Sequence, residues 1–299
     1  MTIFLNIRQR PTGHGVADHV TTHEITLDPV THNVVTDHEL RAGDLASAVL
    51  GKNILLAMHG FNVNQLDGYQ KLSNWSTLLD LDKTWLFIGI VWPGDSSWLG
   101  PLCYPGEGKH AIDCGNLLAP FILDNLAGAN SLSLVSHSLG ARFLLQTVTT
   151  LNKLAPKLSV RQVALMAGAI NHDCLTAEYA SAASNIGNIA VLASVKDEVL
   201  AAAFPIGNVF EGIIDAHHPW FQSALGHLGP KSMPPGKTIP PYQIPSGWNF
   251  GHGSYLELAP RAVPALAIPQ DVPIEGTPPP FLNGYESSWS AAFVSSRLR

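Results

Sequence analysis

The feature that most constrains this chain is a series of short apolar runs that alternate with segments of helical periodicity. The runs show no polar alternation, so they predict strands that are buried on both faces of a sheet. Between them, apolar side chains recur every three or four residues, for example at Tyr69, Leu72 and Trp75. Such alternation predicts an α/β fold, with a mostly parallel central sheet and helices on both faces. The predicted buried strands are 53–58, 85–92, 132–135, 163–167 and 189–193.

Segments outside this regular pattern lead to weaker expectations. The segments 2–8 and 22–27, which lie in a polar stretch of the first 50 residues that contains several histidines, predict strands at the edge of the sheet. A helix is predicted over 110–126. Pro120 is expected to break or kink this helix near Ala119, because proline lacks the N–H that a helical hydrogen bond needs.

The C-terminal part of the chain has a different character. More than half of the 22 prolines lie beyond residue 230, where helical periodicity stops. The segment also carries many aromatic side chains, which favours a loop-rich cover over a solvated tail. We therefore predict one α/β domain over 1–299, with a cap or loop insertion at 201–247 and a Pro-rich extension at 256–299.

Composition limits the classes of partner. Only 13% of residues are charged, the net charge is −6, and Lys and Arg do not cluster, so nothing predicts binding to nucleic acid or to anionic lipid. No dinucleotide-binding or phosphate-binding glycine motif follows a strand, and the Cys and His spacings fit no zinc site. We expect a small, uncharged ligand and neither a cofactor nor a metal.

The compartment is predicted from three observations. No apolar run reaches the roughly 18 residues of a membrane-spanning helix, and residues 1–10 place their basic side chains after the apolar ones, the reverse of a secretory signal. Cys103, Cys114 and Cys174 form a sparse, odd set that favours reduced thiols, with pairing of Cys103 and Cys114 left open. These features predict a cytoplasmic protein.

The most informative stretch for chemistry is Ser136-His-Ser138-Leu-Gly140, which joins a predicted strand to a predicted helix. A serine at the apex of such a sharp turn is held in a strained backbone, and small residues two positions away let strand and helix pack closely. Here Ser136 stands where glycine is more common. The pattern predicts that Ser138 is a nucleophile, whereas a plain helix-capping turn is the alternative.

A second turn, His59-Gly60-Phe61-Asn62, follows the predicted strand 53–58 and can present a backbone N–H. Where a serine turn of this kind is catalytic, the acyl oxyanion is held by the N–H after the nucleophile and by one from an earlier loop. The corresponding groups here are Leu139 and Phe61. His59 is interpreted as a structural histidine that fixes its loop.

Together these motifs resemble the serine α/β-hydrolase superfamily. His-Gly-Phe-Asn and Ser-His-Ser-Leu-Gly-Ala-Arg are similar to motifs of a largely uncharacterised bacterial branch with esterase-like and lipase-like members, and the resemblance covers roughly residues 50–256. It implies that the catalytic acid follows a late strand and that the histidine lies nearer the C-terminus.

The resemblance implies candidates for both remaining members of a catalytic triad. Asp197 is the preferred acid because it lies just beyond the predicted strand 189–193; Asp173 is the alternative and Glu198 the third choice. His252, between two glycines, is the preferred base. The competing histidines are His217, His218 and His227, which lie in or beside the predicted cap.

The resulting hypothesis is hydrolysis of a small apolar or modest-sized carboxylic ester through Ser138, His252 and Asp197, by way of an acyl-enzyme. Two alternatives stay open. The same triad could serve an acyltransferase or thioesterase, or the fold could persist as a non-catalytic binding module.

Overall fold

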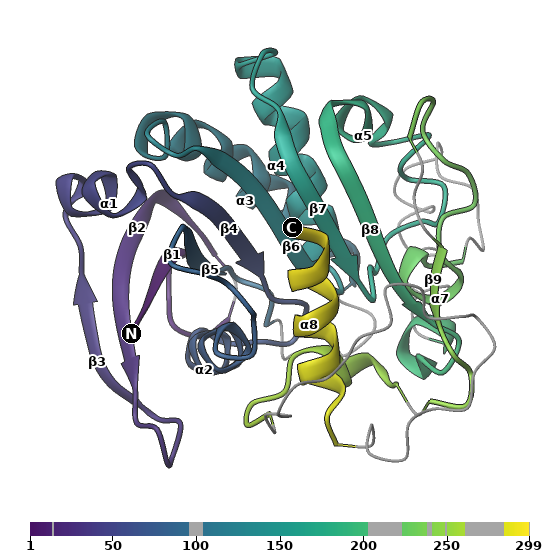
Figure 1. The fold of residues 1–299 in the computed structure, drawn as a ribbon, viewed down its shortest axis with the longest axis horizontal. Helices are drawn as coiled ribbons and strands as arrows, with labels where there is room; N and C mark the ends of the chain where they lie inside the picture. The colour runs from purple at the N-terminus through teal and green to yellow at the C-terminus, as the bar shows by residue number, and fades with distance from the viewer. Residues whose placement is uncertain are drawn as a thin grey trace.

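The computed structural model describes residues 1–13, 15–95, 104–202, 223–237, 241–248, 250–260 and 284–298. These residues form a nine-stranded sheet in the order β3-β2-β1-β5-β4-β6-β7-β8-β9, with helices on both sides (Figure 1). The strands from β1 to β9 in this order run parallel, whereas β2 is antiparallel to both of its neighbours. The α/β fold predicted from the sequence is confirmed. The strands are β1 Thr2–Arg8, β2 Val16–Leu27, β3 Val34–Glu39, β4 Asn53–Met58, β5 Trp85–Val91, β6 Ser131–His137, β7 Val160–Met166, β8 Ile186–Ser194 and β9 Pro241–Ile244.

The five predicted buried strands correspond to β4, β5, β6, β7 and β8, with ends that shift by at most a few residues. In-register pairing brings their C-terminal ends together, since Met58 lies opposite Ser136 and His137 lies opposite Met166. The loops that follow these strands therefore meet at one edge of the sheet. In open α/β sheets this edge is where binding sites form.

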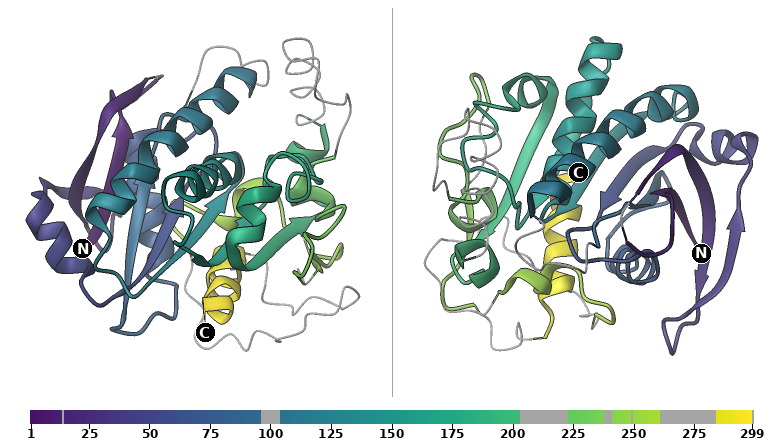
Figure 2. Two further views of the ribbon diagram at one scale, coloured as in Figure 1. Left: turned by 90° about the horizontal axis from the view of Figure 1, so that it is seen from above. Right: turned by 180° about the vertical axis from the view of Figure 1, so that it is seen from behind.

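Helices cover both faces of the sheet (Figure 2). Helices α3 and α4 pack against each other on one face, where α4 covers the central strands β4, β6 and β7 and α3 covers β2. Helices α2 and α8 pack together on the other face, as the right-handed connections of parallel strands require. The helices are α1 Ala42–Val49, α2 Gln65–Ser76, α3 Tyr104–Asn125, α4 Gly140–Leu154, α5 Ala180–Asn185, α7 Leu225–Leu228, α8 Glu286–Leu298 and the 3₁₀ helix η2 His252–Tyr255.

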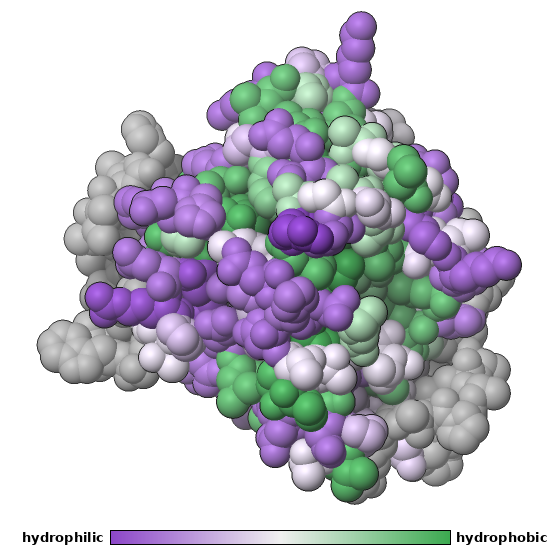
Figure 3. Space-filling model, turned by 90° about the vertical axis from the view of Figure 1, so that its left-hand side faces the viewer, coloured by the Kyte–Doolittle hydropathy of each residue, from purple (hydrophilic) through white to green (hydrophobic). Residues whose placement is uncertain are grey.

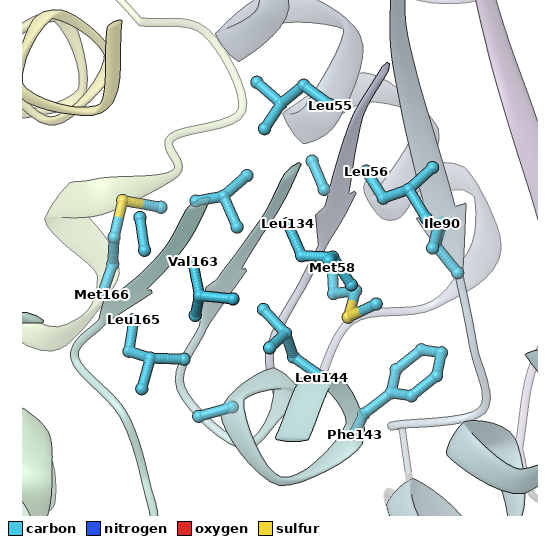
Figure 4. Packing of buried hydrophobic residues seen from close by; sticks show 14 of the residues in the cluster. Leu55, Leu56, Met58, Ile90, Leu134, Phe143, Leu144, Val163, Leu165 and Met166 are labelled. Atoms are coloured by element: carbon cyan, nitrogen blue, oxygen red, sulfur yellow. The ribbon is translucent and has the colours of Figure 1, made fainter. Parts of the chain in front are cut away.

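The core under α4 holds the base of the turn at Ser138. Phe143 and Leu144 of α4 point into a layer of strand side chains that includes Met58, Leu134 and Val163 (Figure 4). All of these side chains are at most 1% exposed. Close packing on this scale fixes where β6 ends and α4 begins.

The prediction that 2–8 and 22–27 are edge strands is wrong. β1 lies between β2 and β5, and β2 lies between β1 and β3. The edge is instead β3, Val34–Glu39, where every side chain beyond the first is exposed. β1 is internal because Phe4, Leu5 and Ile7 are completely buried.

The face of the molecule on the side of β3 carries a broad band of hydrophilic side chains, which apolar patches interrupt (Figure 3). On the edge strand itself, Asp37 of β3 accepts a hydrogen bond from the His23 ring of β2 at 2.7 Å. Charged side chains of this kind reduce the tendency of an open edge to pair with other chains.

The expected break at Pro120 is also wrong, since α3 continues from Tyr104 to Asn125. Pro120 itself is exposed, while Leu118, Ala119 and Ile122 around it are almost fully buried. Packing on both sides of the proline therefore outweighs the loss of one helical hydrogen bond.

The described residues of the C-terminal part include a strand and a helix that the sequence pattern did not predict. Within the segment 201–247, residues 241–244 form β9 and pair with β8, while residues 203–222 and 238–240 of the predicted insertion lie outside the described residues. Within 256–299, residues Glu286–Leu298 form the helix α8, which the loss of helical periodicity after residue 230 did not indicate. In the part of the chain that the structure describes, no helix is both long and apolar enough to cross a membrane.

Candidate active site

Ser138 occupies the turn between β6 and α4 with a positive φ of 56°. That conformation is strained for any residue with a side chain. Its own N–H donates to the carbonyl of Met166 at 2.9 Å, and its carbonyl accepts from Ala141 N–H at 3.0 Å. The backbone on both sides of the turn is thus fixed. The side chain, only 3% exposed, is presented at the edge of the sheet where the strands end.

Gly140 shows why the turn needs small residues. A Cβ added at Gly140 would lie 2.6 Å from the carbonyl oxygen of His59, which is closer than real Cβ contacts come. The start of α4 therefore packs directly on the end of β4. This close approach brings the loop after β4 beside Ser138.

His252 lies between Ser138 and Asp197. Its Nε2 is 2.8 Å from Ser138 Oγ, and its Nδ1 is 2.7 Å from Asp197 Oδ2. Since an ionised carboxylate only accepts, Nδ1 carries the proton and Nε2 is left to accept from the serine hydroxyl. The three side chains form one continuous hydrogen-bonded line.

Asp197 is completely buried just beyond β8. Its second oxygen, Oδ1, accepts from Leu200 N–H at 2.9 Å, so both carboxylate oxygens are engaged. Nearby, Ser194 Oγ donates to the carbonyl of Phe250 at 2.8 Å, which ties the end of β8 to the segment that carries His252.

The alternative residues lie elsewhere. Neither Asp173, which is half-buried, nor the exposed Glu198 contacts the ring of His252. His227 lies in α7, and the other two competing histidines, His217 and His218, fall outside the described residues. Among the candidate acids and bases that the structure describes, only Asp197 and His252 join Ser138.

Two backbone N–H groups lie in the segments next to Ser138. Leu139 is the N-cap of α4, and Phe61 is in the loop after β4. Within the described residues, neither N–H has a protein acceptor. The loop is close to the serine, because a Cβ added at Gly60 would lie 2.7 Å from Ser138 Cβ. Both groups are free to donate to an anionic oxygen, and the positive end of the α4 dipole supports such an anion.

His59 binds its own loop through one ring nitrogen and the loop after β5 through the other. Nδ1–H donates to the Gly60 carbonyl at 2.9 Å, Nε2 accepts from Trp92 N–H at 3.2 Å, and the ring stacks on the Trp92 indole at 5.6 Å. Burial lowers the pKa of His59 from 6.5 to about 3, so the ring is neutral. These contacts agree with its interpretation as a structural histidine.

His137 is a residue of the site that sequence reasoning missed. Its Nε2–H donates to the backbone carbonyl of His252 at 2.8 Å, and the two rings lie 5.0 Å apart. Burial, followed by the nearby His252, lowers the pKa of His137 well below its usual range, so this ring is also neutral. The only sequence signal was its position directly before Ser138, where many residue types fit.

Other groups at or near this edge are less informative. Cys174 is buried, and burial raises the pKa of its thiol, which makes a poor nucleophile. Cys103 lies outside the described residues. In the described ranges no three His, Cys, Asp or Glu side chains gather as a metal site would require.

Comparison with known proteins places this geometry in context. A family model described as an alpha/beta hydrolase of unknown function, DUF900, matches residues 42–266. No curated protein matches the chain. Among solved structures, it is similar to lipase B of Aspergillus fumigatus, with 10% identity and a TM-score of 0.29, over 64% of this chain and 49% of that one. It is also similar to the peroxisomal alpha-beta-hydrolase Lpx1 of Saccharomyces cerevisiae, with 12% identity and a TM-score of 0.26, over 55% and 41% of the two chains. The chain thus spans about half the length, or less, of these two proteins.

Proposed function

This chain belongs to the DUF900 family of α/β hydrolases of unknown function, and from that premise we propose that it hydrolyses carboxylic esters with Ser138 as nucleophile. The observation that carries the proposal is the line from Ser138 Oγ through His252 to Asp197, with both hydrogen bonds shorter than 3 Å. A hydroxyl is a weak nucleophile until a base accepts its proton. The imidazole of His252, with Nε2 directed at the serine hydroxyl, supplies that base.

In the first half-reaction, Ser138 Oγ forms a bond to the acyl carbon while its proton moves to His252 Nε2. The ring is then a cation, and buried Asp197 stabilises it through Nδ1–H. Collapse of the tetrahedral intermediate breaks the ester bond. The leaving alkoxide takes the proton from Nε2, and an acyl-serine remains.

In the second half-reaction, a water molecule attacks the acyl-serine. His252 accepts a proton from that water and returns it to Ser138 Oγ as the carboxylic acid leaves, which regenerates the starting state. The same ring thus acts as base, then acid, in each half.

The negative charge that develops on the acyl oxygen needs donors that are already in place. We assign this role to the N–H groups of Leu139 and Phe61, which have no other acceptor among the described residues. One well-placed donor of this kind contributes on the order of 3 kcal/mol to transition-state stabilisation.

For the substrate we propose a small, uncharged ester of apolar or modest-sized acids. The low charge of the chain supports this choice, as does the absence of a basic cluster in the sequence. The insertion 201–247, whose first part is rich in aromatic and branched apolar residues, is proposed to contribute a cap.

The role of Ser138 is tested by covalent labelling and by ester hydrolysis. Wild-type protein should be labelled stoichiometrically by a fluorophosphonate probe and should hydrolyse p-nitrophenyl acetate. Ser138→Ala should lose both properties. Ser133→Ala is the matched control, because Ser133 is another buried serine on β6 and makes no contact with His252. A folded wild type that is neither labelled nor active would support the binding module instead.

The acid is tested by a pair of substitutions. Asp197→Asn should lower kcat by about 10⁴-fold, because the amide favours the wrong tautomer of His252. Asp173→Asn should be close to wild type, since Asp173 does not contact the ring. The opposite result would move the acid to Asp173. Addition of alcohol or thiol acceptors, followed by product analysis, separates hydrolysis from acyl transfer.

A further inference from the structure

Arg8, at the C-terminal end of β1, has a guanidinium group with no exposed surface. It lies outside residues 42–266, the part of the chain that the family model matches. Burial of a charge is unfavourable unless it is paired and fully hydrogen-bonded. The hydrogen bonds of the Arg8 side chain therefore show which parts of the structure it fixes in place.

The guanidinium reaches three loops at the edge where the parallel strands end. In the loop after β5, it pairs with Asp95 and donates through Nη1 to the carbonyl of Trp92 at 2.7 Å. In the loop after β4, Nη1 also donates to the carbonyl of Val63 at 3.4 Å. In the turn after β1, it donates to the carbonyls of Arg10 at 3.0 Å and Gly13 at 3.2 Å.

Asp95 completes the arrangement from the other side. It is 9% exposed, and its Oδ2 accepts from Gly13 N–H at 3.0 Å while Oδ1 pairs with Arg8. The pair therefore fixes the β1 turn to the β5 loop. All five guanidinium contacts and both carboxylate oxygens are used within these loops.

The β4 loop that contains Phe61 is held on both sides by the same β5 loop. Trp92 donates its N–H and its indole N–H to His59, at 3.2 and 2.9 Å. On the other side, Asn62 donates its N–H to the carbonyl of Gly94. Asn62 has a positive φ of 58°, which persists only when the surroundings hold it. Phe61 lies between these two attachments, and its N–H is left free.

We propose that Arg8 is a positioning residue for the oxyanion site: with Asp95, it fixes the β5 loop and Val63, and through them the direction of the Phe61 N–H. The inference rests on the proposed function. It assigns to β1, a strand outside the family match, a part in the chemistry at Ser138. Arg8 itself touches no reacting atom.

A donor that acts on the oxyanion affects the transition state more than the bound ester. Arg8→Met keeps the length and apolar stem of the side chain but removes all five contacts. It should lower kcat for p-nitrophenyl acetate by about 10-fold to 100-fold, the effect of moving a catalytic group by about 1 Å. KM should stay within about threefold.

Two milder variants should lower kcat by smaller amounts than Arg8→Met. Arg8→Lys keeps the charge beside Asp95 but cannot reach several carbonyls at once, so it should recover part of the lost kcat. Asp95→Asn keeps the shape of its side chain and leaves the carbonyl contacts of Arg8 intact, so it should reduce kcat less than Arg8→Met. If Arg8→Met does not fold, these two variants carry the test.

A boronic acid inhibitor supplies a readout that loss of stability does not move. Its tetrahedral adduct with Ser138 uses the oxyanion donors, so its Ki should rise in proportion to the loss of kcat across the series. The control is Leu45→Ala in α1, which removes a fully buried side chain far from these loops. It should unfold more easily but keep the wild-type kcat and Ki.

The outcomes separate the two proposals. If wild-type protein turns over ester and Arg8→Met retains its kcat and Ki, the inference is wrong while the proposed function stands. A fall in kcat that Leu45→Ala reproduces at equal stability also overturns it. An inert wild type that is not labelled at Ser138 overturns both.

Discussion

Acidification should destabilise this protein through His59, and the structure allows the effect to be calculated. His59 has no exposed surface, and its ring nitrogens are engaged by Gly60 of the β4 loop and by Trp92 of the β5 loop. Its pKa is about 3 in the folded protein, compared with 6.5 for an ordinary histidine. In the unfolded chain the ring is in water and takes up a proton near pH 6.5.

Between pH 6.5 and 3, the unfolded state therefore binds more protons than the folded state. Stability must then fall as the pH falls; the loss begins near 6.5 and is complete near 3. Each pH unit in this window removes about 1.4 kcal/mol per such group. At pH 5.0 the loss from His59 is about 2 kcal/mol, a large share of the roughly 5–15 kcal/mol that stabilises a typical domain. His137 acts in the same direction, because its pKa is also lowered by burial.

The assay is urea unfolding at pH 7.5 and pH 5.0, with the free energy of unfolding extrapolated to water. Wild-type protein should lose at least about 2 kcal/mol between the two pH values. His59→Gln cannot take up a proton, so its loss should be smaller by about 2 kcal/mol, even though it starts from a lower stability. The window lies above the range where carboxylates with lowered pKa values, such as Asp28 and Asp82, begin to titrate.

The matched control is Trp92→Phe. It removes the indole N–H that donates to the His59 carbonyl, which weakens the same loop, but it keeps the titrating ring. Its pH dependence should equal that of wild type. If His59→Gln and Trp92→Phe lose the same free energy between pH 7.5 and 5.0, His59 is not a buried neutral group and the reasoning fails.

Three further substitutions test the packing. Pro120→Ala should stabilise the protein by about 1–3 kcal/mol, because exposed Pro120 interrupts the hydrogen bonds of α3; an unchanged urea midpoint would contradict this. Ser133→Ala should be neutral or stabilising by up to about 1 kcal/mol in thermal unfolding, since its buried hydroxyl has no partner within the described residues; a clear loss of stability would show that a partner exists. Gly60→Ala should lower kcat/KM for p-nitrophenyl acetate by about 100-fold, because its Cβ would lie 2.7 Å from Ser138 Cβ and displace the nucleophile; wild-type turnover would refute the close approach.

Local patterns were sufficient for the centre of the fold. The predicted strand 53–58 has the bounds of β4, and the helical stripe at Tyr69, Leu72 and Trp75 falls in α2. The turn at Ser138 is also local, since a strand, a sharp turn and a helix need only the residues within the turn and its flanks. The catalytic roles of Ser138, His252 and Asp197 stay predictions, but their sequence positions follow from the order that the superfamily resemblance implies.

The errors arose where a distant part of the chain decides the outcome. Residues 2–8 lie in a polar stretch that suggests an edge strand, yet β5 and β2 enclose β1 on both sides. Pro120 disfavours a helix locally, yet buried neighbours on both sides of it keep α3 intact. The final helix α8 lacks a strong apolar stripe because serines on it, such as Ser290, hydrogen-bond buried groups, including the indole N–H of Trp75.

The amino-acid sequence alone thus determined the order of elements, the parallel sheet and the residue types at the candidate site. It could do so because periodicity and turn chemistry depend on near neighbours along the chain. Tertiary structure alone decided which side chains meet. His137 reaches the carbonyl of His252, and Arg8 reaches Asp95, across separations that no local pattern encodes. Buried polar groups must find partners wherever the packed fold provides them, so these contacts become visible only once the sheet is assembled.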